Sequence, residues 1–142
     1  MRILGIDLGK KRIGLALSDA LGILASPFEV FEYDSSAYAL NRITAAAKDN
    51  GVEKMVIGLP LNMNGTRGPE AEGVQAFAEV LEETSGIPVV CWDERLTTTQ
   101  AQKALLEGDV SRENRRVRAD MVAAALLLQA YLDTYRNREG SS

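Results

Sequence analysis

The 142-residue sequence contains no histidine. Histidine is the commonest general base near neutral pH and the commonest zinc ligand, so its absence excludes Ser-His-Asp and Cys-His catalysis. A hydrolase of this composition has to work with carboxylates, which hold hard cations such as Mg²⁺, or with a lysine. Any catalytic chemistry must therefore be sought among the acidic and basic side chains.

Cysteine and long apolar runs are also scarce. The single cysteine, Cys91, fits a reducing compartment. No apolar run is long enough to span a bilayer, and residues 1–20 lack the order of a signal peptide, so we expect a cytoplasmic protein with no membrane partner. The net charge of −4 argues against a broadly basic surface. A local basic patch can still bind phosphates.

The apolar runs that are present predict five strands, at residues 2–8, 13–18, 25–31, 54–58 and 87–92. The first reads as a central strand because both of its alternating faces are apolar until Asp7. Gly9 is expected to supply the turn into the second strand. Pro27 favours an edge position for the third strand, because proline cannot donate a hydrogen bond to a strand ladder.

A helical period follows the third strand and returns later in the chain. The first helix should bury one face and end near residues 50–51; the residues of that face are Ala37, Leu40, Ile43, Thr44 and Ala47. The second should begin at Pro69 and end at Gly86, with a buried stripe of Val74, Phe77, Ala78 and Leu81. Two more helices are expected after residues 97–99 and at residues 121–128.

This order of elements predicts an α/β fold with a mixed sheet and helices on its faces. Right-handed crossovers would place the two later strands parallel to the first, beyond its free edge. The carboxyl ends of the first, fourth and fifth strands then share one rim, where α/β sheets usually carry their sites. We expect one domain over residues 1–136 and a flexible tail over residues 137–142.

Four acidic residues could meet at that rim: Asp7, Asp93, Glu94 and Asp120. Clustered carboxylates repel one another unless cations neutralise them, and a pair of metal ions is a known device for phosphoryl chemistry. Each residue also has an ordinary structural explanation. Asp7 could cap a turn, Asp93 could accept backbone N–H groups, and Asp120 could cap a helix.

Basic residues follow the acidic ones. Lys10, Lys11 and Arg12 come directly after the first strand and could hold phosphates, or could be a solvated hairpin turn. Arg95 leaves the same strand end as Glu94 and could contact substrate, form a structural ion pair, or do both. The arginines that could follow a nucleic-acid backbone, if their loop is not simply solvated, are Arg112, Arg115, Arg116 and Arg118.

The loop over residues 59–68 ends at a helix N-terminus, where free N–H groups attract anions. Its asparagines, Asn62 and Asn64, could seat a phosphate or the scissile strand. An ordinary strand-to-helix connection with an Asn64-Gly65 turn is the alternative.

Four short stretches together closely resemble the YqgF/RuvX family, RNase H-like proteins described as Holliday junction resolvases or pre-16S rRNA nucleases. They are Gly5-Ile6-Asp7-Leu8-Gly9 with Arg12-Ile13-Gly14, Gly58-Leu59-Pro60-Leu61-Asn62-Met63-Asn64-Gly65, Asp93-Glu94-Arg95-Leu96-Thr97-Thr98, and Asp120 followed by Ala123-Ala124-Ala125. The resemblance implies an RNase H-like, five-stranded mixed sheet of order 3-2-1-4-5 and a metal-dependent phosphodiesterase site.

By position, the resemblance assigns Asp7 to the first-strand aspartate of that fold, Glu94 to the acidic residue of the family's Asp-Glu-Arg motif, and Asp120 to the C-terminal helix aspartate. Asp93 is their neighbour. Many relatives in the wider group place an acid on the fourth strand, which here ends in Gly58-Leu59-Pro60. Glu94 must therefore reach further across the rim.

These features predict a Mg²⁺- or Mn²⁺-dependent endonuclease with one or two ions, acting on structured nucleic acid and most simply on precursor 16S rRNA. A Holliday junction resolvase acting on DNA is the alternative, and it would be expected to act as a homodimer because two symmetric cuts are needed. A non-catalytic RNA-binding module and a small actin-like or sugar-kinase-like nucleotide binder are two further hypotheses.

Overall fold

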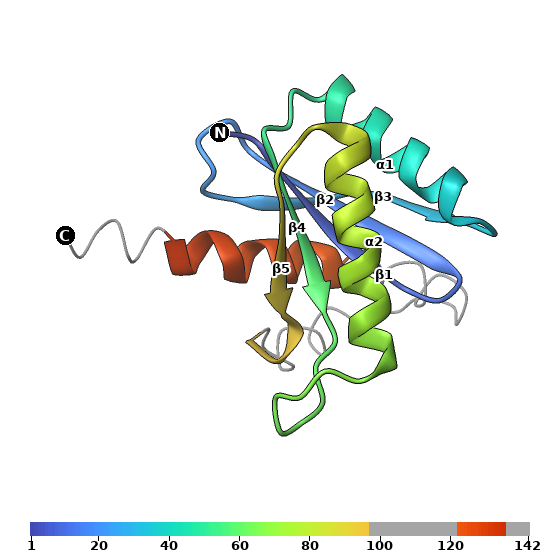
Figure 1. Ribbon diagram of the computed structural model, residues 1–142. Coiled ribbons are helices and arrows are strands. Elements are labelled where there is room, and N and C mark those ends of the chain that lie inside the picture. Colours follow the sequence, from blue (N-terminus) through green and yellow to red (C-terminus); the bar gives the residue numbers. More distant parts are fainter. Residues whose placement is uncertain (97–121, 136–142) are drawn as a thin grey trace, which may run out of the picture.

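The computed structural model describes residues 1–96 and 122–135 (Figure 1). Five strands form one sheet: β1 (Ile3–Leu8), β2 (Arg12–Ser18), β3 (Ala25–Glu32), β4 (Lys54–Leu59) and β5 (Val89–Asp93). The sheet order is β3-β2-β1-β4-β5. β1 pairs antiparallel with β2 and parallel with β4, and β4 pairs parallel with β5. The predicted mixed sheet and its order are confirmed.

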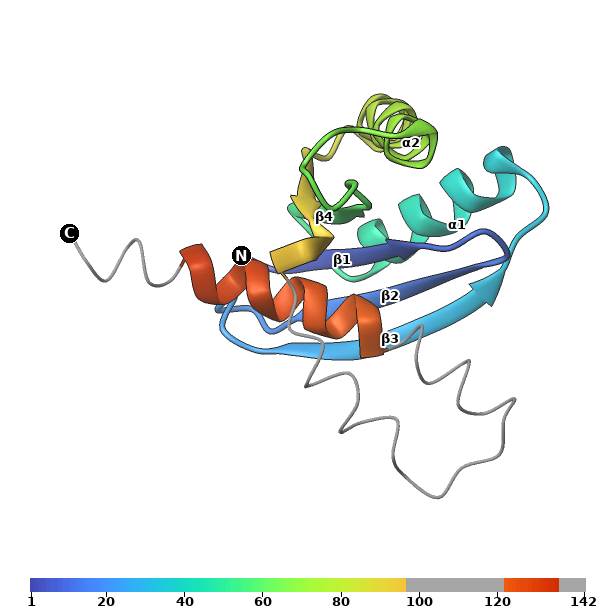
Figure 2. The ribbon, with the colours of Figure 1, turned by 90° about the horizontal axis from the view of Figure 1, so that it is seen from below.

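Helices cover both faces of this sheet (Figure 2). α1 (Ser36–Asp49) and α2 (Pro69–Ser85) lie on one face, and a helix over residues 122–135, the C-terminal helix, lies on the other. The Ser35 side chain caps α1 by accepting a hydrogen bond from the Tyr38 amide, and α2 begins at Pro69 and ends at the left-handed Gly86, as predicted. None of the described helices is long and apolar enough to cross a membrane.

Side-chain alternation along β1 and β4 divides the core into two layers. Leu4, Ile6 and Ile57 are buried with residues of α1 and α2. Ile3 and Val56 are buried with the C-terminal helix. Because neighbouring positions on a strand point to opposite faces, every second residue of β1, ending with Asp7, belongs to the layer of the C-terminal helix.

The C-terminal helix packs unusually closely on β1 at Gly5. A Cβ atom added there would lie 2.8 Å from the Leu128 Cβ and 3.1 Å from the Ala124 carbonyl oxygen. Further along the helix, the Tyr131 ring lies 5.3 Å from the Lys54 ammonium, at the start of β4. The helix therefore runs antiparallel to β1, and its N-terminal end points toward the rim where β1 and β4 end.

Three local expectations need correction. In α1 the predicted Ile43 and Ala47 are buried, but Ala37 is exposed. The buried face also includes Ala39 and Ala46, so the stripe is rotated away from Ala37. β5 begins at Val89, two residues later than expected. Gly9 does not adopt a left-handed conformation. It is needed for space, since an added Cβ would lie 2.6 Å from the Arg12 carbonyl oxygen.

The expected edge position of the third strand is confirmed. β3 pairs only with β2 in this sheet. Leu15 pairs with Glu29 and Ala16 with Pro27, so Phe28 is an extra residue in the ladder. The proline therefore lies at a β-bulge on an edge strand, a position that tolerates a missing donor.

Candidate functional site

Asp7 lies at the carboxyl end of β1, on the face that carries the C-terminal helix. The Ile6 side chain, one position earlier, is fully buried under α1 and α2. Ile6 is paired with Ile57 in the parallel ladder, and continuing that register by one residue sets Asp7 beside Gly58. Both positions point to the same face, at a spacing of about 4.8 Å between strands.

The Glu94 carboxylate lies over Gly58. A Cβ atom built on Gly58 would be 2.6 Å from the Glu94 Oε1 and 2.9 Å from its Cγ. Glu94 belongs to a short 3₁₀ helix (Glu94–Leu96) that directly follows β5. Because β4 lies between β5 and β1 in the sheet, the Glu94 side chain has to cross β4 to approach Asp7. The absence of a side chain at Gly58 is what leaves room for it.

The pKa of Glu94 is raised to about 7. Burial of the carboxyl group is the largest cause, followed by the negative charges of Asp7, Glu70 and Asp93. A half-buried carboxyl group surrounded by acidic neighbours is a typical place for a proton donor or a bound cation. The neighbour that sequence reasoning missed is Glu70, which looks like an ordinary acidic first turn of α2.

Asp93 and Glu94 have different surroundings although they are adjacent. The Asp93 Oδ2 lies 2.7 Å from the Arg95 Nη2, and its Oδ1 accepts hydrogen bonds from the Arg95 Nε and amide N at 3.0 Å. These bonds lower the pKa of Asp93. Since alternating residues of β5 face opposite sides, Asp93 points away from the layer that holds Asp7. Within this pair, Glu94 is the residue that approaches Asp7.

Arg95 also fixes the loop between β4 and α2. Its Nη1 donates to the Met63 carbonyl oxygen at 3.2 Å. Its guanidinium also lies beside Gly65, whose left-handed conformation closes the loop. The structural ion pair considered for Arg95 is thus present, and it connects the end of β5 to the neighbouring loop.

Asn62 and Asn64 use their side chains inside that loop. The Asn62 Nδ2 donates to the Thr66 Oγ1 at 3.0 Å. The Asn64 Oδ1 accepts from the Thr66 amide N at 3.1 Å. Both asparagines are exposed. Their predicted contact with nucleic acid stays a prediction, and their observed contribution is to shape the loop.

Two of the remaining predicted basic residues, Lys10 and Arg12, lie in the described part of the chain. Lys10 is exposed at the hairpin turn. Asp7 pairs with Gly14 of β2, and the next residue, Ile13, is buried on the face of α1 and α2. Arg12, one position further along β2, therefore points to the same face of the sheet as Asp7. Arg12 also forms an ion pair of 3.5 Å with Glu32. The remaining predicted site residues lie outside the described residues; they are Asp120, Arg112, Arg115, Arg116 and Arg118.

No group of three or more acidic or cysteine side chains within residues 1–96 and 122–135 is placed to hold a metal ion. Asp7 and Glu94 supply two carboxylates. The third predicted ligand, Asp120, precedes the C-terminal helix by two residues and falls outside that part of the chain. Among the described residues, Asp7 and Glu94 are therefore two neighbouring carboxylates on the side to which the helix N-terminus points.

The family model for RuvX, described as Holliday junction resolvase, matches residues 1–134. A Bacillus licheniformis protein named "Putative pre-16S rRNA nuclease" is 51% identical over 136 residues, covering 94% of this chain and 98% of the relative. A Symbiobacterium thermophilum protein of the same name is 50% identical over 142 residues, covering 100% of this chain and 99% of the relative.

Solved structures with the same fold are more distant in sequence. T. thermophilus RuvC in complex with a Holliday junction substrate has a TM-score of 0.62 at 15% identity, covering 100% of this chain and 98% of that chain. The fowlpox virus resolvase bound to Holliday junction DNA has a TM-score of 0.58 at 13% identity, covering 95% and 99%. Taken with the family match along nearly the whole sequence, these comparisons show that the chain belongs to the RuvX family and is a hydrolytic nuclease of RNase H-like fold.

Proposed function

We propose that the protein is a divalent-metal-dependent endonuclease that matures precursor 16S rRNA in the cytoplasm. Asp7 and Glu94, with Asp120 as the predicted third ligand, would hold one or two Mg²⁺ or Mn²⁺ ions. The observation that carries the proposal is the Glu94 carboxylate, which lies over Gly58 and faces the negative charge of Asp7. The names of relatives about 50% identical support the substrate.

The donor set fits a hard divalent cation. Mg²⁺ and Mn²⁺ prefer carboxylate oxygens, and the described site offers two carboxylates with Glu70 close enough to raise the pKa of Glu94. Burial and the repulsion between these acids are the costs that a cation would relieve. A bound ion would supply Lewis-acid stabilisation of the charge that develops at the scissile phosphate.

The chain's own residues would orient the substrate. Arg12, on the same face as Asp7, has a guanidinium that can bind a phosphate oxygen in exchange for its weak contact with Glu32. Arg95, by fixing the loop over residues 59–68, would keep Asn62 and Asn64 at the edge of the site. Asp93 would serve the site indirectly, by holding Arg95.

A DNA four-way junction is the second candidate substrate. The family description and the resolvase structures favour it. A nuclease that makes paired cuts in a symmetric junction needs two active sites, so this function would require a homodimer. The two candidate functions therefore differ in substrate and in expected oligomeric state.

One cleavage panel tests both. Purified wild-type protein is offered a precursor 16S rRNA fragment with its 5′ leader, single-stranded RNA and a DNA four-way junction, each with Mg²⁺, Mn²⁺, Ca²⁺ or EDTA. Asp7→Asn and Glu94→Gln are compared with Asp49→Asn and Glu53→Gln, which make the same changes at exposed positions away from the rim. We expect metal-dependent cleavage of the rRNA fragment that both site variants lose and both controls keep.

The opposite results are equally clear. Cleavage that persists in EDTA, or that Asp7→Asn leaves at the wild-type rate, would reject the metal mechanism. Cleavage of the junction with the rRNA fragment intact would favour the resolvase. Binding of RNA with no cleavage under any condition would favour a non-catalytic module.

A further inference from the structure

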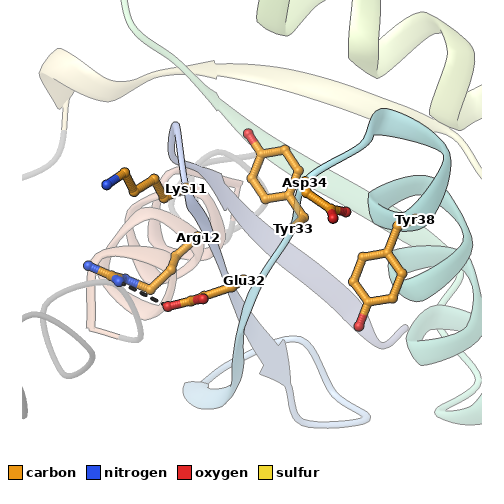
Figure 3. Close-up of a pocket in the computed structure, with 6 residues that line it drawn as sticks. All are labelled: Lys11, Arg12, Glu32, Tyr33, Asp34 and Tyr38. Atoms are coloured by element: carbon orange, nitrogen blue, oxygen red, sulfur yellow. Dashed lines mark hydrogen bonds and ion pairs between the residues drawn. The ribbon is translucent and has the colours of Figure 1, made fainter.

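A cleft of about 590 Å³ lies beside the hairpin turn between β1 and β2 (Figure 3). Its walls come from the turn, from the end of β3 and from the first turn of α1, and the residues that line it are Lys11, Arg12, Glu32, Tyr33, Asp34 and Tyr38. A volume of roughly 300–1,000 Å³ is usual for ligand clefts. Of these side chains, Tyr33 also packs against the edge of the core layer under α1 and α2.

The cleft has two chemically different ends. Figure 3 shows Lys11 and Arg12 at one end, Tyr38 at the other, and Tyr33 and Asp34 between them. The basic end can attract a phosphate, while the tyrosine rings offer flat apolar surfaces next to a carboxylate acceptor. A nucleotide has the same division, with a phosphate at one end and a flat base with N–H donors at the other.

Both tyrosines are held in place before any ligand binds. The Tyr33 hydroxyl donates to the Gly9 carbonyl oxygen, which ties the ring to the hairpin turn. The Tyr38 hydroxyl accepts from the Arg42 Nη1 at 2.7 Å, and its ring packs edge-on against Phe31. Tyr38 nevertheless keeps 43% of its surface exposed. Rings that are already ordered lose little side-chain entropy when a base stacks on them.

The cleft lies at the same end of the sheet as the proposed nuclease site, with Arg12 as the lining residue nearest to it in the strand pairing. Arg12 lies in the cleft and points to the face of the sheet that carries Asp7. The turn between β1 and β2 begins after Leu8, one residue beyond Asp7, and it forms the wall that carries Lys11. A strand whose phosphate is held at Asp7 and Glu94 can therefore continue past Arg12 into the cleft.

We infer that this cleft binds an unpaired nucleotide of the substrate strand, near the scissile phosphate. The base stacks on Tyr38 and Tyr33, Asp34 accepts a hydrogen bond from the base or sugar, and Lys11 contacts the phosphate. This inference rests on the proposed nuclease function. It adds a requirement for single-stranded character next to the cut.

Binding without cleavage tests the inference directly. Fluorescence anisotropy in EDTA measures the affinity of a labelled eight-nucleotide RNA and of DNA with the same sequence, between 50 and 200 mM salt. Tyr38→Leu removes the ring, and Tyr38→Phe keeps it. The matched controls are Tyr135→Leu, a tyrosine of similar exposure at the far end of the C-terminal helix, and Lys48→Gln, an exposed lysine of α1.

We expect Tyr38→Leu to weaken binding about tenfold, the usual loss for one stacked base, and Tyr38→Phe to stay within about twofold of wild type. Lys11→Gln should lower the slope of log affinity against log salt by about 0.7, the value for one phosphate contact on a single strand. Tyr135→Leu and Lys48→Gln should change neither quantity.

Three results would overturn the inference. Tyr38→Leu and Lys11→Gln could behave as their controls do. Lys11→Gln could change the salt slope while Tyr38→Leu has no effect, which would indicate charge attraction without a bound base. Wild-type protein could cleave precursor rRNA yet fail to bind single strands. This last result would leave the proposed function standing, whereas the loss of both binding and cleavage would reject the proposed function itself.

Discussion

The Glu94 carboxylate occupies the space that a side chain at Gly58 would fill, with its Oε1 2.6 Å from the position of the missing Cβ. The Glu94 side chain can take this position only because residue 58 of β4 is a glycine. A carboxylate that follows the fifth strand thus lies over the end of the fourth, as the expected longer reach of Glu94 requires.

Gly58→Ala should abolish most of the activity without unfolding the protein. The new methyl group would displace the Glu94 side chain from its place over Gly58. This overpacking should lower the free energy of unfolding by about 1–3 kcal/mol and moves a side chain of the proposed site. We expect cleavage to fall at least about tenfold. Gly73→Ala, in α2 with no atom within 4 Å of the added Cβ, is the matched control and should keep full activity. Equal activity of the two variants would contradict the role assigned to Gly58.

Gly58→Asp combined with Glu94→Ala should recover part of the activity that Glu94→Ala loses. An aspartate at position 58 would carry its oxygens two bonds from Cβ, in the region that the Glu94 carboxylate leaves. The rate of metal-dependent cleavage by the double variant, compared with each single variant, measures the recovery. A double variant no better than Glu94→Ala would show that the exact approach of the Glu94 side chain matters, beyond the presence of an acid.

Glu94→Gln should make the metal-free protein more stable at high pH only. The pKa of Glu94 is about 7 in the folded protein against 4.5 in the reference state, so folding binds a proton between these values. The contribution of the protonated Glu94 carboxyl group to the free energy of unfolding is therefore fully present below about pH 4.5. It is lost as the pH rises through about 7. We expect Glu94→Gln to match wild type near pH 4.5 and to exceed it by up to about 3 kcal/mol at pH 8.5.

Urea unfolding at both pH values, with and without Mg²⁺, checks this expectation. Added Mg²⁺ should raise the unfolding midpoint of wild type at pH 8.5 more than that of Glu94→Gln, because only the wild type gains a carboxylate ligand. The same Mg²⁺ effect in both proteins would argue against Glu94 as a ligand.

Arg95→Lys should reduce activity while leaving stability nearly unchanged. Lysine cannot reproduce the forked contact with Asp93 together with the bond to the Met63 carbonyl oxygen. An exposed ion pair contributes less than about 1 kcal/mol, so the effect should appear in the loop over residues 59–68. We expect faster proteolysis within that loop and slower cleavage of substrate. Arg67→Lys, in the same loop but bonded to Gln75, is the control.

Gly5→Ala should destabilise the protein by about 1–3 kcal/mol. The added methyl group would meet the Leu128 Cβ at 2.8 Å and the Ala124 carbonyl oxygen at 3.1 Å, and the latter belongs to helix backbone that cannot move alone. Thermal unfolding of this variant beside Gly73→Ala gives the difference. A melting temperature equal to that of wild type would mean that the C-terminal helix shifts freely on the sheet.

Hydrophobic period and turn residues were enough to predict the sheet, because β1 and β4 are apolar on both faces and Pro69 and Gly86 bound α2 clearly. The choice between Asp93 and Glu94 could not be made from their spacing. It depends on which face of β5 each leaves and on the space above Gly58. Ala37 was misassigned because alanine fits either face of a helix and carries little information about burial.

Other parts of the site had no sequence signal of their own. Glu70 looks like a favourable charge at a helix start, and only the meeting of α2 with the end of β5 brings it near Glu94. The cleft combines a turn residue, Lys11, with Tyr38 from a helix that begins after another strand. Such a combination follows from the pairing of β2 with β3, in which Arg12 lies opposite Glu32.

The contact between Gly5 and Leu128 joins the beginning of the chain to its end. During synthesis, Ile3 and Val56 leave the ribosome long before the helix that buries them. The face of the sheet that carries Asp7 therefore stays uncovered by helix until residues 122–135 have also been made.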